Sequence, residues 1–409
     1  MPNLFSISDK TTRRRAYVLL LAGTFSFLVG LVYGTVRRYQ DPLQNSLGGT
    51  TVEIQLEEKS NISSEIELER KPPNINIKIK AVGDIVPGTN YPQNRLAPQK
   101  KVLFKSVKPL FKGADFLFGN FESTLTNYPF SPKGVGGGMV FAFRTPPSYT
   151  QILKEAGFDV LSVANNHSFD FSTQGFKDTI KNIENADIQA LGRKGQILIA
   201  KRKGLAIAWI GFSFFEGHNS LNNLKAAKSL VKVARENADI VVISVHSGAE
   251  GTGAMRVKNQ NEYFFGENRG NMVQFTRTMI DNGADLILGH GPHVPRALEL
   301  YKGKLIAYSL GNFMGYRTLS TEAELAYSLV LEVELNNQGN FVAGKIIPVI
   351  LNRQGIPYPD RQGRSIKLIR QLTKSDFPKT PLIIDNKGRI LRAINKKPVK
   401  KREAIALDK

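Results

Sequence analysis

Four of the five histidines in the chain stand at the end of an apolar segment of the kind that forms a buried strand. His167 follows the segment FDVLSVANN, His246 ends the segment ADIVVISVH, and His290 and His293 lie in the loop GHGPH after ADLIL. Chance placement would scatter these side chains along the sequence. Two imidazoles in one tight loop favour metal binding, because imidazole is a common metal ligand. His218 follows a Glu-Gly pair in a loop and is expected at the surface.

Oxygen-bearing side chains stand at the ends of other apolar segments. Asp84 ends INIKIKAVGD, Asn120 and Glu122 follow ADFLFG, and Asn166 directly precedes His167. Asp84 and Asn120, each taken alone, are also typical of a structural turn, whereas the Asn166-His167 pair is the stronger signal. Combined with the imidazoles, these oxygen-bearing side chains are a ligand set that suits Mn, Fe, Zn or a mixed pair. The chain has no cysteine, so thiolate ligands are excluded.

Such a ligand set predicts hydrolytic chemistry. A carboxylate bridge can hold two metals about 3.5–4 Å apart, where they polarise a phosphoryl oxygen and generate hydroxide near neutral pH. A neighbouring histidine that is not a ligand can protonate the leaving group or stabilise charge on the transferred group. Asp170 follows His167 at a spacing that brings its carboxylate within reach of the imidazole.

The elements that must position these residues alternate between strands and helices. This alternation predicts βα units and a largely parallel sheet, at one edge of which the strand ends would gather the polar side chains. Tyr327–Val349 instead predicts a hairpin around a turn at 336–340, and the domain is expected to close near Asn352. The predicted strands, with the polar residues that follow them, lie within 75–84, 114–123, 158–167, 238–250, 284–294 and 304–313. The predicted helices are 147–156, 173–185, 229–237 and 271–282.

The N-terminal segment 16–36 has no charged residue and is long enough to cross a bilayer, which takes about 20 apolar residues. Lysine and arginine are denser before it than after it, which places the N-terminus in the cytoplasm and the main domain outside. A cleaved signal peptide is the alternative. The expected organisation is a cytoplasmic basic segment 1–15, a transmembrane anchor 16–36, a stalk 37–73, a folded domain 74–352 and a basic C-terminal tail 353–409.

The formal net charge is +21, which suits contact with nucleic acid or with anionic membranes and polymers. The basic run KKPVKKR at 396–402 is either a solvated tail or a contact for anionic lipid or polymer. Nucleic acid is not expected, because aromatic residues do not alternate with the basic ones and the domain is predicted to lie outside the cell. Four arginines near the motifs either contact a polymer or only favour solubility, namely Arg144, Arg256, Arg269 and Arg296.

From 75 to 315 the chain resembles the capsule-synthesis CapA family, the poly-γ-glutamate biosynthesis proteins of the calcineurin-like metallophosphatase superfamily. The resemblance rests on motifs in the family's order: AVGDIVPG, FGNFESTLT, ANNHSFDF, VVISVHSGAE, GADLILGHGPHV and LIAYSLGNF. It implies a layered α/β/β/α metallophosphatase-like sandwich after a single N-terminal transmembrane helix. It also implies an anionic surface polymer and its membrane synthase complex as partners.

The same resemblance assigns roles to individual residues. His167 would act on the transition state, and Asp170 would orient it. The implied metal ligands are Asp84, Glu122 (or, less readily, Asn120), Asn166, His246, His290 and His293, and the implied substrate-binding residues are Asn120, Glu250, Arg144 and Asn312. Val86 stands where the superfamily has a further imidazole, and Gly291 replaces a histidine common in the last loop. One or two divalent ions are therefore expected.

Two functions from different classes follow. The first is a membrane-anchored, extracytoplasmic protein for capsule or poly-γ-glutamate synthesis or export that carries a metal-dependent, phosphoesterase-type hydrolase site. The alternative is a non-catalytic component of the cell envelope that binds the polymer or assembles its synthase, with the site as a relict.

Overall fold

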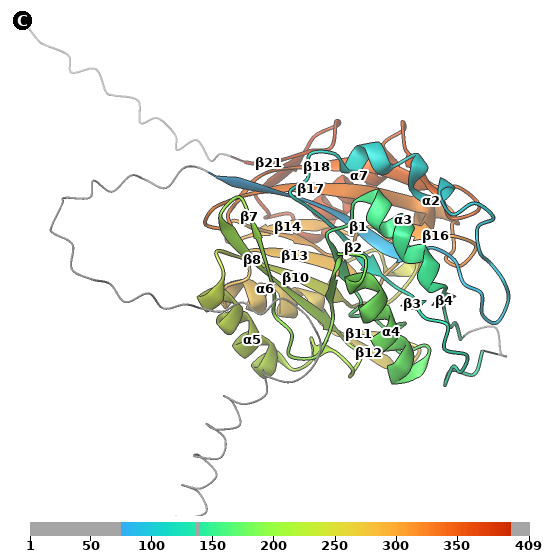
Figure 1. Cartoon of the computed structure of the whole chain (residues 1–409). Helices are drawn as coiled ribbons and strands as arrows, with labels where there is room; N and C mark the ends of the chain where they lie inside the picture. Colours follow the sequence, from blue (N-terminus) through green and yellow to red (C-terminus); the bar gives the residue numbers. More distant parts are fainter. Residues whose placement is uncertain (1–74, 136–139, 394–409) are drawn as a thin grey trace, which may run out of the picture. The chain divides into compact units, whose positions relative to one another are not determined.

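The computed structural model describes residues 75–135 and 140–393 of the chain. Strand β1 (Asn76–Val86) lies in the middle of the larger sheet, with neighbours from both ends of this part of the chain. It runs parallel to β2 (Phe116–Phe121) and antiparallel to β17 (Tyr327–Asn336). Figure 1 shows β1 in blue beside β17 in orange, which are far apart in the sequence.

The larger sheet has the order β20-β21-β18-β17-β1-β2-β5-β6, with β16 beside β1 and β19 beside β18. Its other strands are β5 (Val160–Ser162), β6 (Gln189–Leu191), β16 (Asn312–Gly315), β18 (Phe341–Leu351), β19 (Pro357–Pro359), β20 (Leu382–Ile384) and β21 (Arg389–Arg392). The predicted hairpin is confirmed, because β17 and β18 pair antiparallel along their length.

The smaller sheet has the order β14-β15-β13-β10-β8-β7, with β9 beside β8. Its strands are β7 (Leu198–Arg202), β8 (Leu205–Ser213), β9 (Asn219–Ser220), β10 (Ile240–His246), β13 (Leu286–His290), β14 (Leu298–Tyr301) and β15 (Lys304–Ala307). Two short ribbons accompany the sheets, one of β3 (Thr124–Leu125) with β4 (Arg144–Thr145) and one of β11 (Glu262–Phe264) with β12 (Glu267–Gly270).

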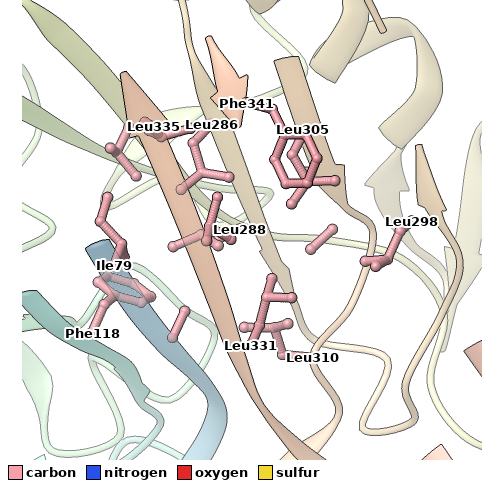
Figure 2. Close-up of a cluster of buried hydrophobic side chains, with 14 of the residues drawn as sticks. Ile79, Phe118, Leu286, Leu288, Leu298, Leu305, Leu310, Leu331, Leu335 and Phe341 are labelled. Carbon is pink, nitrogen blue, oxygen red and sulfur yellow. The ribbon is translucent and has the colours of Figure 1, made fainter. Parts of the chain in front are cut away.

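The two sheets face each other across a buried apolar layer. Figure 2 shows Ile79, Phe118 and Leu331 of the larger sheet in the same cluster as Leu286 and Leu305 of the smaller sheet. Alternate residues of each strand point the other way, as the period of two in a strand requires. The prediction of a single sheet edge was therefore wrong: the strand ends belong to two sheets, because each carries one face toward a shared core.

Helices cover the outer faces. Leu103, Ile152 and Ile180 pack on the outer face of the larger sheet, and Val231 and Met279 pack on that of the smaller sheet. The helices are α2 (Val102–Lys105), α3 (Thr150–Ala156), α4 (Ser172–Glu184), α5 (Leu224–Asn237), α6 (Met272–Asp281) and α7 (Arg364–Asp376), and short 3-10 turns lie at Lys108–Phe111, Pro147–Tyr149, Thr252–Ala254 and Ala323–Ala326. The described residues thus form an α/β/β/α sandwich.

The domain does not close at Asn352. Strand β21 pairs with β18, and Ile390 enters the layer between the sheets. Helix α7 carries Ile366, Ile369 and Leu372 on one face, so its apolar stripe packs into the core although its other residues are basic and polar. The predicted tail is therefore largely folded. Its apolar stripe was not recognised in the sequence because the segment is rich in basic residues.

The predicted anchor at 16–36 and the basic run at 396–402 lie outside the described residues. Within 75–135 and 140–393, no helix combines the length and apolar character needed to cross a membrane.

Candidate metal centre

Asp84 is placed by the end of β1. In the register of the larger sheet it lies opposite Asn120 of β2 on one side and Asn312 of β16 on the other. Its backbone N–H donates to the carbonyl of Gly311 over 2.9 Å, and its side chain is fully buried. Two parallel neighbours therefore fix the carboxylate at the strand end, as the sequence predicted for this position.

The imidazoles come from the smaller sheet. His246 ends β10 and His290 ends β13, and the two residues are direct partners in the parallel register. His293 follows in the loop, with a positive φ of 61° that turns the chain back toward the cluster. His246 and His290 are buried, and the side chain of His293 is 12% exposed.

The two sets of side chains meet between the sheets. Nδ1 of His290 lies 3.5 Å from Oδ1 of Asp84, and Nδ1 of His293 lies 3.2 Å from Oδ2 of the same carboxylate. Nε2 of His246 lies 3.6 Å from Oε1 of Glu122. One ligand atom from each of Asp84, Glu122 and His293 fits within a 4.8 Å span. The predicted carboxylate and imidazole ligands thus surround one small volume, although they come from both sheets.

These residues fit a cation because their ligand atoms have no other partner. Oδ2 of Asp84, both carboxylate oxygens of Glu122, Nε2 of His246 and both ring nitrogens of His290 are buried without a hydrogen bond to any described residue. An unpaired buried polar group costs about 1–3 kcal/mol, and a charged group costs more. Six such atoms in one cluster are therefore explained by a bound ion, and nitrogen with carboxylate oxygen suits Zn, Mn or Fe.

The charges of the cluster support the same interpretation. Burial raises the pKa of Glu122 well above its usual range. Burial would also raise the pKa of Asp84, but the adjacent imidazoles of His290 and His293 outweigh it and hold the pKa below its normal value. Burial works against charge on His293, yet Glu122, Asp84 and Glu250 together raise its pKa to about 10. The carboxylates therefore favour positive charge within this cluster, which His293 carries as a proton.

The asparagines occupy different roles from one another. Asn120 donates to Oδ1 of Asp84 over 2.8 Å, and its own oxygen accepts from Asn165 over 3.2 Å. Both ends of the Asn120 amide are therefore engaged in orienting Asp84. Asn166 follows Asn165 directly, and its side-chain oxygen has no partner among the described residues. Asn166 thus keeps a free ligand atom, whereas Asn120 does not.

His167 is held by Asp170, as the sequence predicted from their spacing. Nδ1 of His167 lies 2.9 Å from Oδ2 of Asp170, and a carboxylate only accepts, so this nitrogen carries the proton. Burial lowers the pKa of His167, against the opposing charge of Asp170. The ring also lines a cavity of about 500 Å³ beside the metal ligands, together with His293, Glu250 and Asn312.

Lys133 was not predicted as a site residue, yet it contacts three residues around His167. Its Nζ lies 2.5 Å from Oδ1 of Asp170 and donates to the carbonyls of Asn166 and Phe141 over 3.2 and 3.3 Å. The backbone N–H of Phe143 donates to the other oxygen of Asp170 over 2.6 Å. Nothing in the local sequence marks Lys133, because its partner lies far along the chain and only the fold brings them together.

The predicted substrate-binding residues separate into two groups. Glu250 lies 3.8 Å from Nε2 of His293, and Asn312 contacts Nδ1 of His293 at 2.9 Å, so both belong to the centre. Arg144 does not: its guanidinium donates to Asn90 and Tyr128 and lies over two aromatic rings. The other three arginines pair with carboxylates, Arg256 with Asp376, Arg269 with Glu250 and Glu267, and Arg296 with Glu262.

One further position differs from the prediction. His218 is fully buried rather than exposed, with its ring nitrogens 2.7 Å from the carbonyl of Gly192 and 3.2 Å from that of Asn165. The surface prediction failed because the loop folds inward under Phe169 and Phe176. Val86, which stands where the resemblance would place an imidazole, is fully buried and offers no ligand.

The fold and the site together define an α/β/β/α protein with a buried carboxylate–imidazole cluster between its two sheets. The chain belongs to the bacterial capsule synthesis protein family PGA_cap, whose model matches residues 78–316. The resemblance noted from the sequence motifs is thereby confirmed.

Two curated relatives cover most of the chain. It is 30% identical over 321 residues to the PGA biosynthesis protein CapA of Bacillus subtilis (strain 168). The matched region covers 72% of this chain and 77% of that protein. It is 28% identical over 329 residues to the capsule biosynthesis protein CapA of Bacillus anthracis, which covers 74% of each. Among solved structures, a 5'-nucleotidase precursor from Thermus thermophilus matches with a TM-score of 0.38 and 12% identity, over 74% of this chain and 59% of that one.

Proposed function

We propose that this protein serves the synthesis or export of an anionic surface polymer of the capsule or poly-γ-glutamate type, and that it does so with a metal-dependent, phosphoesterase-type hydrolytic site. Family membership supports the first part of the proposal. The second part rests on one observation, the convergence of unpaired ligand atoms from Asp84, Glu122, His246 and His290. We further propose that segment 16–36 anchors the chain, with this domain outside the membrane and near the polymer synthase.

The ligands would be Asp84, Glu122, Asn166, His246, His290 and His293, holding one or two divalent ions. A divalent ion bound there supplies Lewis-acid polarisation of a phosphoryl oxygen and a nucleophile at neutral pH.

The remaining residues position the reacting groups. Asp170 fixes the ring of His167 through Nδ1, which leaves Nε2 to exchange a proton with the leaving group. Lys133 fixes Asp170, and Glu250 and Asn312 hold His293 from two sides. The His167 ring is therefore held in place by a series of polar contacts through Asp170 and Lys133.

The test is metal content and hydrolysis of bis(4-nitrophenyl) phosphate by the purified full chain with added Mn²⁺. We expect bound metal and metal-dependent turnover, with a His290→Ala variant losing the metal and a His167→Ala variant keeping the metal but losing turnover. Lys302→Ala serves as a matched control, because Lys302 is an exposed residue paired only with Asp281 at the far end of β14.

Unchanged turnover in both histidine variants would reject the enzyme at these residues. A protein without metal that still binds poly-γ-glutamate would instead favour the non-catalytic alternative, in which the domain assembles the polymer machinery.

A further inference from the structure

The cavity beside the metal centre has a wall that does not suit a polyanion. Of its lining residues, Phe141, Phe143 and Phe264 are aromatic, and Leu319 and Leu325 are aliphatic. Its volume of about 500 Å³ lies within the range of pockets that bind small molecules, about 300–1,000 Å³. The wall stands next to His167 and His293, so whatever fills it lies beside the reacting groups.

We infer that this cavity binds a small substrate with an apolar or aromatic body and a single anionic group, rather than a segment of the anionic polymer. What this inference says about the reaction at the metal centre rests on the proposed function. What it says about binding in the cavity does not. The substrate of the site would then be a small ester that serves polymer production, and the polymer would not be cleaved here.

Phe143, part of the aromatic wall, contacts Asp170, the same carboxylate that orients His167. The ring of Phe143 lies 4.5 Å from the His167 ring, and its backbone N–H donates to Asp170. The ring of Phe141 stacks on Phe143 at 6.3 Å and 18°. A body that packs on these rings is therefore held at a fixed distance from the nitrogen that exchanges the proton.

The third aromatic residue of the lining, Phe264, contacts a buried cation. The guanidinium of Arg269 lies 5.3 Å from the ring centre of Phe264 and 4.1 Å from that of Phe214. Arg269 is itself held by Glu250 over 2.9 Å and is 3% exposed. This contact limits the positions open to the Phe264 ring, so that less side-chain freedom is lost when a ligand binds.

The charges of the lining favour one anionic group. Arg317 is the single arginine or lysine among the described residues that line the cavity, and Glu250 lines it as well. A chain of carboxylates would meet the negative charge of Glu250, and outside the metal centre only Arg317 would balance it. A ligand with an apolar body and one anionic group needs no more than Arg317 and the metal centre offer.

Fluorine NMR line broadening on the full chain in lipid nanodiscs tests this inference, with 4-fluorophenylphosphonate and fluoromethylphosphonate as probes. Phosphonates are not hydrolysed, so the readout is binding and not turnover. We expect the aryl probe to bind roughly tenfold tighter, because ring burial and aromatic stacking add to the shared contacts of the phosphonate. A Phe264→Ala variant should reduce the preference to less than about threefold.

Phe130→Ala is the matched control, since Phe130 is 70% exposed and does not line the cavity. If Phe264→Ala fails to fold, Phe141→Ala replaces it, because Phe141 is about half exposed and costs little stability. Equal binding of the two probes, an unchanged preference in the Phe264→Ala and Phe141→Ala variants, or displacement of the aryl probe by a lower concentration of penta-γ-glutamate would overturn the inference. An aryl preference without any hydrolysis would reject the proposed function and leave this inference standing.

Discussion

Gly83 precedes Asp84, and its replacement by alanine should damage the centre without touching a ligand. A Cβ at this position would lie 1.8 Å from the carbonyl oxygen of Gly311, about 1.6 Å short of the 3.4 Å at which ordinary contact begins. The obstacle is backbone, which no rotamer change can clear. The same oxygen accepts the hydrogen bond from the N–H of Asp84, so β1 and the loop before β16 must separate there.

The expected cost has two parts. Overpacking of a tight interior costs about 1–3 kcal/mol, and a buried carbonyl that loses its donor costs about 1–3 kcal/mol. Their sum, about 2–6 kcal/mol, is a large share of the 5–15 kcal/mol by which proteins are usually stable. The Gly83→Ala variant should therefore either fail to fold or fold with Asp84 displaced and little bound metal.

Urea unfolding midpoints and metal content of the full chain measure both outcomes. Gly253→Ala is the matched control, because a Cβ there meets open space; its free energy of unfolding should stay within about 0.5 kcal/mol of the parent. If Gly83→Ala shows the parent midpoint together with the parent metal content, the reasoning about the Gly-Asp motif is refuted.

Three further predictions concern single features. Lys133→Met should cost about 1–3 kcal/mol and slow hydrolysis, because it leaves one oxygen of the buried Asp170 unpaired; a parent-like rate and midpoint would contradict this. Chelation should lower the thermal midpoint by several degrees and added Mn²⁺ should restore it, whereas a His290→Ala variant should show no such difference. Burial lowers the pKa of His218 below its usual 6.5, so its stability contribution is complete above that pH and is lost as pH falls through the lowered folded value. In a His218→Gln variant, the free energy of unfolding should change less with pH between about pH 7 and 5 than in the parent. An equal pH dependence in the two proteins would contradict a lowered pKa for His218.

Much of the fold was predictable because it depends on local patterns. Alternation of apolar and charged residues identified β1, and the hairpin of β17 and β18 followed from two apolar runs around the 336–340 turn. Helix α5 was predicted from Ser229 but begins at Leu224, because the side chain of Asn223 accepts from the N–H of Ala226 and caps it. Such caps extend helices beyond what apolar periodicity alone marks.

Other features were missed because they arise between distant segments. Lys133 reaches Asp170 across a folded loop, and Phe264 faces the cavity through the position of Arg269. The strand β21 joined the larger sheet through its pairing with β18, although its neighbourhood in the sequence is basic. None of these contacts has a local signature, since each depends on which surfaces pack together.

The sequence by itself determined the types of the site residues and their places at strand ends, because strand periodicity and the residues that end a strand are local properties. Only the tertiary structure decided that Asp84 and Glu122 come from one sheet while His246 and His290 come from another. The physical reason is the shared core: two sheets bury their inner faces against each other, and this packing sets the few ångströms between carboxylate and imidazole. It likewise turned a set of separate motifs into one buried cluster whose ligand atoms lack hydrogen-bond partners among the described residues.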